Sequence, residues 1–213
     1  MSATDPTDPD AITTVVFDMG GVLLDWDPRH LYRKVFDDPA AMEHFLSEVC
    51  PLSWHLQHDR GAPFAETLPA RAALHPDHAD HIVLWGSRYD EMIAGEVPGT
   101  ADVVAELAAL GLRLLGLTNL PAEVWPSVRA SWPVMTAFEG VLVSGEEGLV
   151  KPDPAIFELL LDRFAIEPAR AVFVDDVAAN VAAAQAVGLH ALRFTDAPTL
   201  RVELAGLGVD LPA

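Results

Sequence analysis

The sequence predicts an α/β protein, built on a doubly wound, Rossmann-like parallel sheet with an inserted helical cap. Two observations carry this prediction. Short apolar runs alternate with helical patterns at both ends of the chain, as in folds whose parallel strands are joined by helices. The block 28–97 interrupts this alternation with helical patterns alone. Apolar residues make up 51% of the 213 residues, which is enough for a substantial core.

The strands are expected where short runs are apolar on both faces. Such runs are typical of parallel strands that helices cover on two sides. The five runs that fit are Thr13–Phe17, Arg113–Leu117, Val141–Val143, Ala171–Val174 and His190–Phe194.

Helices are expected between these strands. Gly111 and Gly188 stand where helices commonly end on a glycine, and they mark two of the boundaries. The four predicted helices are Thr100–Leu110, Ala122–Ser131, Pro154–Phe164 and Val177–Val187.

The block 28–97 contains no convincing strand, and it is too long for a simple connection. We therefore expect a helical cap at 28–97, inserted into an α/β core formed by 13–27 and 98–213. Residues 1–12 are expected to form a flexible tail, and they lack the basic and apolar regions of a signal peptide. Within the cap, helical patterns cover Leu31–Phe36, Ala41–Val49, Phe64–Leu74 and Ala79–Ile93.

The charge of the chain excludes two classes of partner. A net charge of −19 at pH 7 disfavours nucleic acid and anionic membranes. No apolar stretch reaches the roughly 18 residues that a membrane span needs. The single cysteine, Cys50, has no internal disulfide partner, which fits a reducing compartment. We expect a cytoplasmic protein, as a monomer or homodimer.

Polar residues follow four of the predicted strands. Ligands of open α/β sheets bind at the carboxyl ends of the strands, so these side chains should meet at one edge. Each has an ordinary interpretation as a turn or capping residue when taken alone. Their joint occurrence in this order favours a functional site, and they are Asp18, Thr118, Asn119, Lys151, Asp175 and Asp176.

The charges of this group predict a metal site. Three carboxylates within a few ångströms repel one another by about 4 kcal/mol per pair at an effective dielectric constant of 20. Lys151, one of only two lysines in the chain, is the one cation expected nearby. Oxygen ligands favour a hard divalent ion, and Mg²⁺ is the expected cofactor. A metal and a lysine together favour phosphate as the ligand, beside an aspartate that can act as a nucleophile.

Four stretches of the chain resemble the motifs of the haloacid dehalogenase-like hydrolase superfamily. They are "VVFDMGGVL", "LTN", "VKPDPAIF" and "FVDDVAANVAAAQAVG". The block 28–97 is similar to the helical C1-type cap of subfamily I, so the resemblance covers nearly the whole chain. It implies a Mg²⁺-dependent phosphatase that acts on a small phosphorylated metabolite through an aspartyl-phosphate, with a sugar phosphate as one candidate.

The resemblance also implies a role for each motif residue. Asp18 would be the nucleophile and a metal ligand, with the carbonyl of Gly20 and the carboxylate of Asp176 as further ligands. Asp175 would assist the metal through water. The remaining positions would bind phosphate or support the site: Thr118 and the amide of Asn119 on the phosphoryl oxygens, Lys151 on phosphate and nucleophile, and Asn180 as a brace.

The sequence departs from the superfamily pattern at Gly20, where most of its phosphatases carry a second aspartate as general acid and base. Three interpretations stay open. The protein could be a phosphatase whose acid–base help is reduced, or comes from another residue, with Asp25, Asp27, His58 and Asp59 as candidates. It could be a metal-independent 2-haloacid dehalogenase, although both acids of the Asp175–Asp176 pair would then be unexplained. It could also bind phosphate or a partner with little turnover.

The stretch 53–68 in the cap resembles the loop that reaches into the site in capped relatives. His58, Asp59 and Arg60 are the specificity candidates within it, with Arg60 able to bind a second anion. A solvated turn ending at Gly61 is the competing interpretation.

Overall fold

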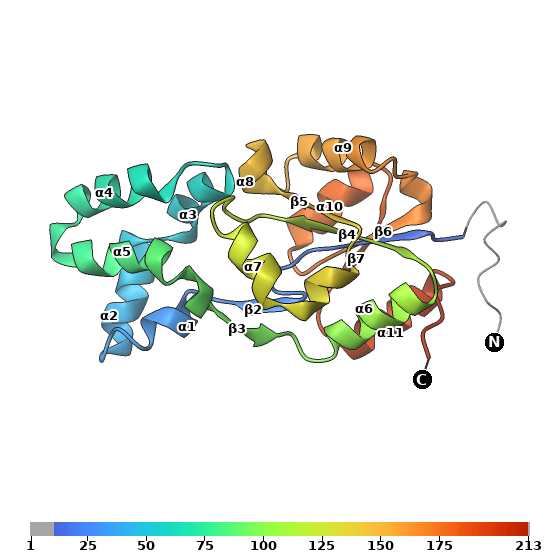
Figure 1. The fold of residues 1–213 in the computed structure, drawn as a ribbon, viewed down its shortest axis with the longest axis horizontal. Helices are drawn as coiled ribbons and strands as arrows, with labels where there is room; N and C mark the ends of the chain where they lie inside the picture. Colours follow the sequence, from blue (N-terminus) through green and yellow to red (C-terminus); the bar gives the residue numbers. More distant parts are fainter. Residues whose placement is uncertain (1–10, 213) are drawn as a thin grey trace.

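The computed structural model describes residues 11–212 and contains a five-stranded sheet in the order β5-β4-β1-β6-β7 (Figure 1). All neighbouring strands of this sheet are parallel, which confirms the predicted fold class. The strands are β1 (Thr14–Phe17), β4 (Arg113–Thr118), β5 (Gly140–Val143), β6 (Ala171–Asp175) and β7 (His190–Arg193).

Helices cover both faces of the sheet and bury its alternating side chains. Val15 and Phe17 belong to one apolar cluster and Val16 to the other, as expected when successive strand residues point to opposite faces. The first cluster is completed by α6 (Thr100–Ala109), α7 (Trp125–Ser131) and α11 (Ala197–Gly206). The second is completed by α9 (Pro154–Arg163) and α10 (Ala178–Ala186).

The register of the central strand fixes the functional edge. Phe17 at the end of β1 pairs with Gly116 of β4 on one side and with Val174 of β6 on the other. The residues just beyond these pairs therefore meet at the carboxyl edge of the sheet. Chain order reverses on either side of β1, and this is the place where open α/β sheets bind ligands.

The cap segment, our name for residues 28–97, is largely helical and packs on its own aromatic centre. Trp85, Tyr32 and Phe45 are fully buried there, and the ring of Tyr32 lies against both of the others. Its helices are α1 (Arg29–Tyr32), α2 (Pro39–His44) with a π-helical turn (Phe45–Val49), α3 (Leu52–Asp59), α4 (Phe64–Leu74) and α5 (Ala79–Ser87).

The prediction that 28–97 lacks a strand is wrong. β3 (Ile93–Glu96) pairs antiparallel with β2 (Leu24–Trp26), and the helix expected over Ala79–Ile93 ends at Ser87. Both strands are too short for a clear period-2 pattern, which is why the sequence did not reveal them. The two chain crossings between the core and the cap segment therefore lie side by side.

The stretch 53–68 is not simply a loop, because α3 occupies its first part and α4 its last. The turn between these helices holds Gly61 at φ 92°, a left-handed conformation that favours glycine. A Cβ on Gly61 would lie 2.8 Å from the carbonyl oxygen of Gly145 in the core. The end of α3 thus rests on the start of α8 (Ser144–Glu147), a short helix that the sequence analysis missed together with α11.

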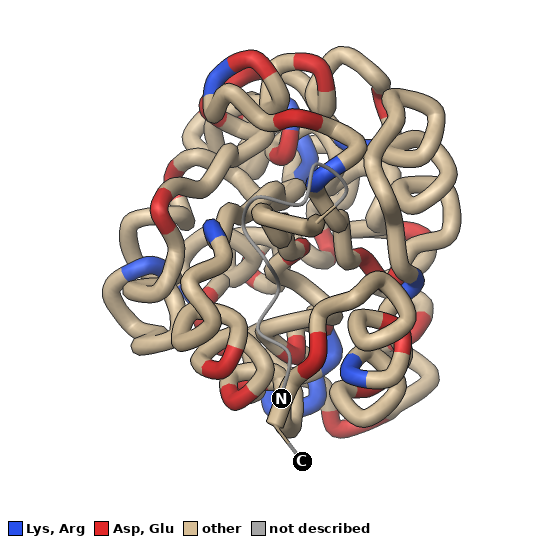
Figure 2. Tube along the Cα trace, turned by 90° about the vertical axis from the view of Figure 1, so that its right-hand side faces the viewer, with Lys and Arg blue, Asp and Glu red and all other residues tan. Residues whose placement is uncertain are grey.

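Residues 1–10 of the expected tail lie outside the described residues, whereas Ile12 is 4% exposed and belongs to the core. Among residues 11–212, no helix combines the length and apolar character needed to cross a membrane. Aspartate and glutamate are scattered along the described trace (Figure 2).

Candidate active site

Asp18 follows the central strand and is 7% exposed. Its backbone N–H donates to the carbonyl oxygen of Val174 at 2.9 Å, which continues the pairing of β1 with β6 by one residue. Its Oδ1 accepts the N–H of Met19 at 2.7 Å and lies 2.8 Å from Lys151 Nζ. Burial raises the pKa of Asp18 to about 7, while Lys151 opposes that rise. The carboxyl group is therefore held in one orientation by a strand end and a cation.

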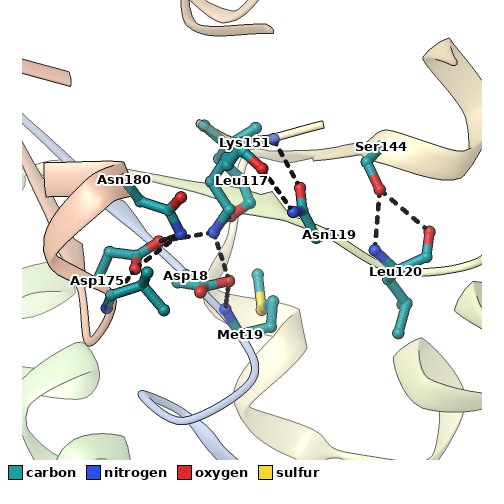
Figure 3. A network of polar contacts seen from close by, with 10 residues as sticks. Asp18, Met19, Leu117, Asn119, Leu120, Ser144, Lys151, Asp175 and Asn180 are labelled. Carbon is teal, nitrogen blue, oxygen red and sulfur yellow. Dashed lines mark hydrogen bonds and ion pairs between the residues drawn. The ribbon is translucent and has the colours of Figure 1, made fainter. Parts of the chain in front are cut away.

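Lys151 lies at the centre of the charge network, with its side chain 1% exposed (Figure 3). Its Nζ donates to Asp175 Oδ2 at 2.7 Å and to the carbonyl oxygen of Leu117 at 3.0 Å, besides contacting Asp18. Burial acts to lower the pKa of the ammonium group, but Asp18 and Asp175 outweigh burial and raise it above its usual value. Lys151 is therefore a fixed positive charge between two carboxylates.

Asn119 fixes the backbone that carries this lysine. Its Nδ2 donates to the carbonyl oxygen of Lys151 at 3.0 Å, and its Oδ1 accepts the N–H of Lys151 at 2.9 Å. Ser144 holds the next residue of the same loop, because its Oγ accepts the N–H of Leu120 at 2.9 Å. The sequence analysis missed Ser144, since a lone serine after β5 carries no distinctive signal.

Asp175, the last residue of β6, is fully buried and its two carboxylate oxygens accept four hydrogen bonds. Oδ1 accepts the N–H of Val177 at 2.8 Å and Asn180 Nδ2 at 3.0 Å. Oδ2 accepts Asn180 Nδ2 at 3.0 Å and Lys151 Nζ at 2.7 Å. Asn180, predicted to brace the site, thus contacts Asp175 directly from the first turn of α10.

Asp176 completes a group of three carboxylates. One ligand oxygen from each of Asp18, Asp175 and Asp176 lies within 4.8 Å of the other two. Burial and the neighbouring Asp175 raise the pKa of Asp176. The loop after Asp18 approaches it closely, because a Cβ on Gly21 would lie 2.7 Å from Asp176 Oδ2. Crowded carboxylates with too few cations form a donor set that fits a hard divalent cation.

Thr118, Asn119 and Gly20 line the same cavity as the charged residues, so the structure brings the predicted core residues together. The cavity has a volume of about 610 Å³ and extends from the sheet edge to the cap segment. From the cap segment, α3 contributes one helical stripe: Leu52, His55, Leu56 and Asp59. Most of the remaining wall is apolar or aromatic and comprises Met19, Leu24, Trp26, Tyr89, Ile93, Leu120, Val128, Pro152, Val177 and Ala179.

The candidates proposed to replace the acid missing at Gly20 lie in very different places. His58 is fully buried outside the cavity, bonded to Thr67 Oγ1 at 2.7 Å, and burial lowers its pKa to about 4. Asp25 forms an ion pair with His30, and Asp27 pairs with Arg29. Within residues 11–212, Asp59 is the member of this set that lines the cavity.

Arg60, the proposed second anion site, is exposed, and it does not line the cavity formed by the described residues. It follows Asp59 at the end of α3, where the helix turns toward Gly61. Leu52, Leu56 and Asp59 are spaced so that they share one face of a helix. This spacing was the sequence signal that could have favoured Asp59 over His58 and Arg60 as a residue of the site.

The fold and the site define an α/β protein with three carboxylates and a buried lysine at the carboxyl edge of its sheet. The chain matches the haloacid dehalogenase-like hydrolases over residues 12–188, and it therefore belongs to this hydrolase family. A sesquiterpene phosphatase of Aspergillus oryzae is 28% identical over 206 residues, covering 90% of this chain and 94% of that protein. A glyceraldehyde 3-phosphate phosphatase of Pyrococcus abyssi is 33% identical over 101 residues, covering 46% of this chain and 42% of that protein.

Solved structures share the fold. A family enzyme of Bacteroides thetaiotaomicron, in complex with magnesium and inorganic phosphate, superposes with a TM-score of 0.68 at 21% identity, covering 87% of this chain and 96% of that one. An L-2-haloacid dehalogenase of Xanthobacter autotrophicus, with chloropropionic acid covalently bound, gives 0.63 at 20% identity, covering 94% of this chain and 85% of that one.

Proposed function

We propose that this hydrolase is a Mg²⁺-dependent phosphatase that forms an aspartyl-phosphate on Asp18. One observation carries the proposal: three carboxylates and one buried lysine gather at the switch point of the sheet. Phosphatase relatives in the same family support it. The cap segment 28–97 would close this site over a core formed by residues 13–27 and 98–213.

The proposed reaction uses residues that are already positioned. The carboxylate of Asp18 attacks phosphorus, and the phosphorus–oxygen bond to the organic group of the substrate breaks, which releases that group as an alcohol. Lys151 stabilises the charge of the phosphoryl oxygens while it remains bound to Asp175. Thr118 and the backbone amide of Asn119, both at the cavity wall, would donate to the same oxygens. Water then attacks the phosphorus of the aspartyl-phosphate, which releases phosphate and restores Asp18.

The residues that would hold the metal are Asp18, Asp176 and the carbonyl of Gly20. Asp175 is a poor direct ligand, because both of its oxygens already accept two hydrogen bonds each. When bound, the Mg²⁺ ion would neutralise the negative charge of the phosphoryl group and of the surrounding carboxylates. The close approach of Gly21 to Asp176 keeps the ligand loop beside that carboxylate.

We further propose that the substrate carries an apolar organic group. Beyond the phosphate end, the cavity offers Leu24, Trp26, Leu52, Leu56 and Ile93. A sugar phosphate would leave several hydroxyl groups against this apolar wall, at a cost for each unpaired group. A terpenoid or similar alcohol would instead bury apolar area. The similarity to a sesquiterpene phosphatase over nearly the whole chain supports the same choice.

A phosphate-release assay tests this function. Wild-type protein is expected to hydrolyse 4-nitrophenyl phosphate with Mg²⁺ and to lose that activity with excess chelator. Asp18→Asn should lower kcat by about 10⁴-fold or more, because the nucleophile is lost. Asp25→Asn is the matched control, because it makes the same change at an exposed aspartate outside the cavity, and it should keep full activity. For the substrate class, decyl phosphate should give a higher kcat/KM than a hexose phosphate.

Other outcomes would overturn the proposal. Metal-independent halide release from 2-chloropropionate, without phosphatase activity, would make the protein a dehalogenase. Tight phosphate binding without any turnover would make it a binding protein. Phosphatase activity that survives Asp18→Asn would show that the nucleophile is a different residue.

A further inference from the structure

The carboxyl group of Asp59 occupies an unusual environment within the cavity. Asp59 ends α3 in the cap segment and lines the cavity that also holds Asp18 and Lys151. Its side chain is 10% exposed, and its Oδ1 has no hydrogen-bond partner among the described residues. A buried ionised carboxylate without a bonded partner is costly, so this position favours the neutral acid. A neutral carboxylic acid beside a phosphate site can donate a proton.

His55 lies on the same face of α3, one turn earlier, with Nε2 at 3.5 Å from Asp59 Oδ1. Trp85 Nε1 donates to His55 Nδ1 at 3.0 Å. Because the indole nitrogen can only donate, His55 Nδ1 must accept, and the proton of the neutral ring resides on Nε2. Burial lowers the pKa of His55 to about 3, which keeps the ring neutral. His55 therefore presents an N–H to Asp59 without forming a true ion pair.

Three titratable groups face Asp59 from different elements. They are His55 on its own helix, Lys151 from the core and Tyr89 from the turn after α5. Burial raises the pKa of Asp59 to about 7, and Lys151 acts in the opposite direction. Burial also raises the pKa of Tyr89 far above its usual value, so the phenol stays neutral. Among Asp59 and the three groups that face it, Asp59 is thus the one whose proton neutral-pH chemistry can move.

We propose that Asp59 is the general acid and base of this enzyme and replaces the aspartate that Gly20 lacks. The proposal rests on the phosphatase function proposed above. When Asp18 attacks phosphorus, the bond to the leaving oxygen breaks and that oxygen takes the proton of Asp59. The resulting Asp59 carboxylate, facing the N–H of His55, then accepts a proton from the attacking water. Asp18 leaves phosphorus as a carboxylate, phosphate is released, and Asp59 is again protonated.

The substitution Gly20→Asp would place a carboxylic acid in the core, at the position where most phosphatases of the family carry one. A Cβ on Gly20 would meet no atom closer than Trp26 Cβ at 3.9 Å, an ordinary contact. Its φ lies outside the left-handed range that requires glycine, unlike that of Gly21 at 76°. An aspartate therefore fits at Gly20, and the absence of a side chain there is not imposed by the backbone. This residue is a neighbour of Asp18 in the same cavity.

The experiment compares two substrates of similar size in wild type, Asp59→Asn, Asp25→Asn and the double variant Asp59→Asn/Gly20→Asp. Benzyl phosphate needs a proton on its leaving oxygen, whereas 4-nitrophenyl phosphate needs none. Asp59→Asn should lower kcat/KM for benzyl phosphate by about 10²–10⁴-fold and for 4-nitrophenyl phosphate by less than about 10-fold. Asp25→Asn should match wild type. The double variant should recover much of the loss on benzyl phosphate.

Asp59→Asn should also show a burst of 4-nitrophenol followed by slow turnover, because the aspartyl-phosphate would form without a base to hydrolyse it. Equal losses of kcat/KM on both substrates, or no loss on either, would overturn the role of Asp59 and leave the phosphatase function standing. If the wild-type protein shows no phosphate release that depends on Asp18, both the proposed function and this inference are wrong.

Discussion

The core and the cap segment each supply one buried aspartate to the same cavity, and the two have different partners. Asp18 in the core accepts the N–H of Met19 and lies 2.8 Å from Lys151. Asp59 in the cap segment has a neutral histidine at 3.5 Å and one oxygen without a bonded partner. Burial raises the pKa of both to about 7 and Lys151 opposes the rise at both, but Lys151 forms an ion pair with Asp18. This difference in partners supports the two proposed roles, attack by Asp18 and proton transfer by Asp59.

Removing the cation from the core side should have the largest effect on the folded state. Lys151→Met leaves Asp18 and Asp175 buried without their counter-ion, so the free energy of unfolding at pH 8 should fall by about 3–5 kcal/mol. Urea denaturation measures this change. Lys34→Met is the matched control, because the other lysine is 54% exposed and pairs with Glu91 on the surface. An equal, small effect of both variants would show that the buried network does not stabilise the fold.

A change on the cap side should be smaller and depend on pH. The pKa of Asp59 is raised from 3.8 to about 7 in the folded state, so stability is lost as pH rises through this interval, because the unfolded state releases its proton while the folded state still holds it. Asp59→Asn removes that penalty. Relative to wild type, the variant should gain on the order of 2–4 kcal/mol between pH 4 and pH 8.

Thermal unfolding across this pH range provides the measurement for Asp59→Asn. Asp25→Asn, whose carboxyl group lies on the surface, should show no such trend. If wild type and Asp59→Asn keep a constant difference from pH 4 to pH 8, Asp59 has an ordinary pKa, and the contrast with Asp18 disappears.

The contact between the two regions gives the smallest expected effect. Gly61→Ala places a Cβ 2.8 Å from the Gly145 carbonyl oxygen and requires a left-handed alanine, so the end of α3 must move away from the core. A shift of Asp59 by a fraction of an ångström should lower kcat about 10-fold on alkyl phosphates. Gly206→Ala, where a Cβ meets nothing within 4 Å, serves as control. Unchanged kcat in Gly61→Ala would mean that this contact does not position Asp59.

The sequence predicted the core better than the cap segment for a physical reason. Asp18 directly follows β1, and Thr118 and Asp175 end β4 and β6, so the parallel sheet alone brings these three residues to one edge. Asp59 meets them only because α3 folds over that edge, and the helical spacing of Leu52, Leu56 and Asp59 does not indicate what this face packs against. The bonds from the Asn119 side chain to Lys151 were equally hidden, since they depend on the path of two loops.

The short β2–β3 ribbon determines how this enzyme could change over evolution. Leu24 pairs with Glu96 and Trp26 with Ile93, so the chain leaves and re-enters the core through adjacent strands. A different helical segment could be joined to the same two strands without altering the distance that the core must span. The exchanged segment would include α3, which contributes both apolar wall residues and Asp59 to the cavity. Substrate preference and the source of the proton would then be inherited as one unit, separately from the nucleophile.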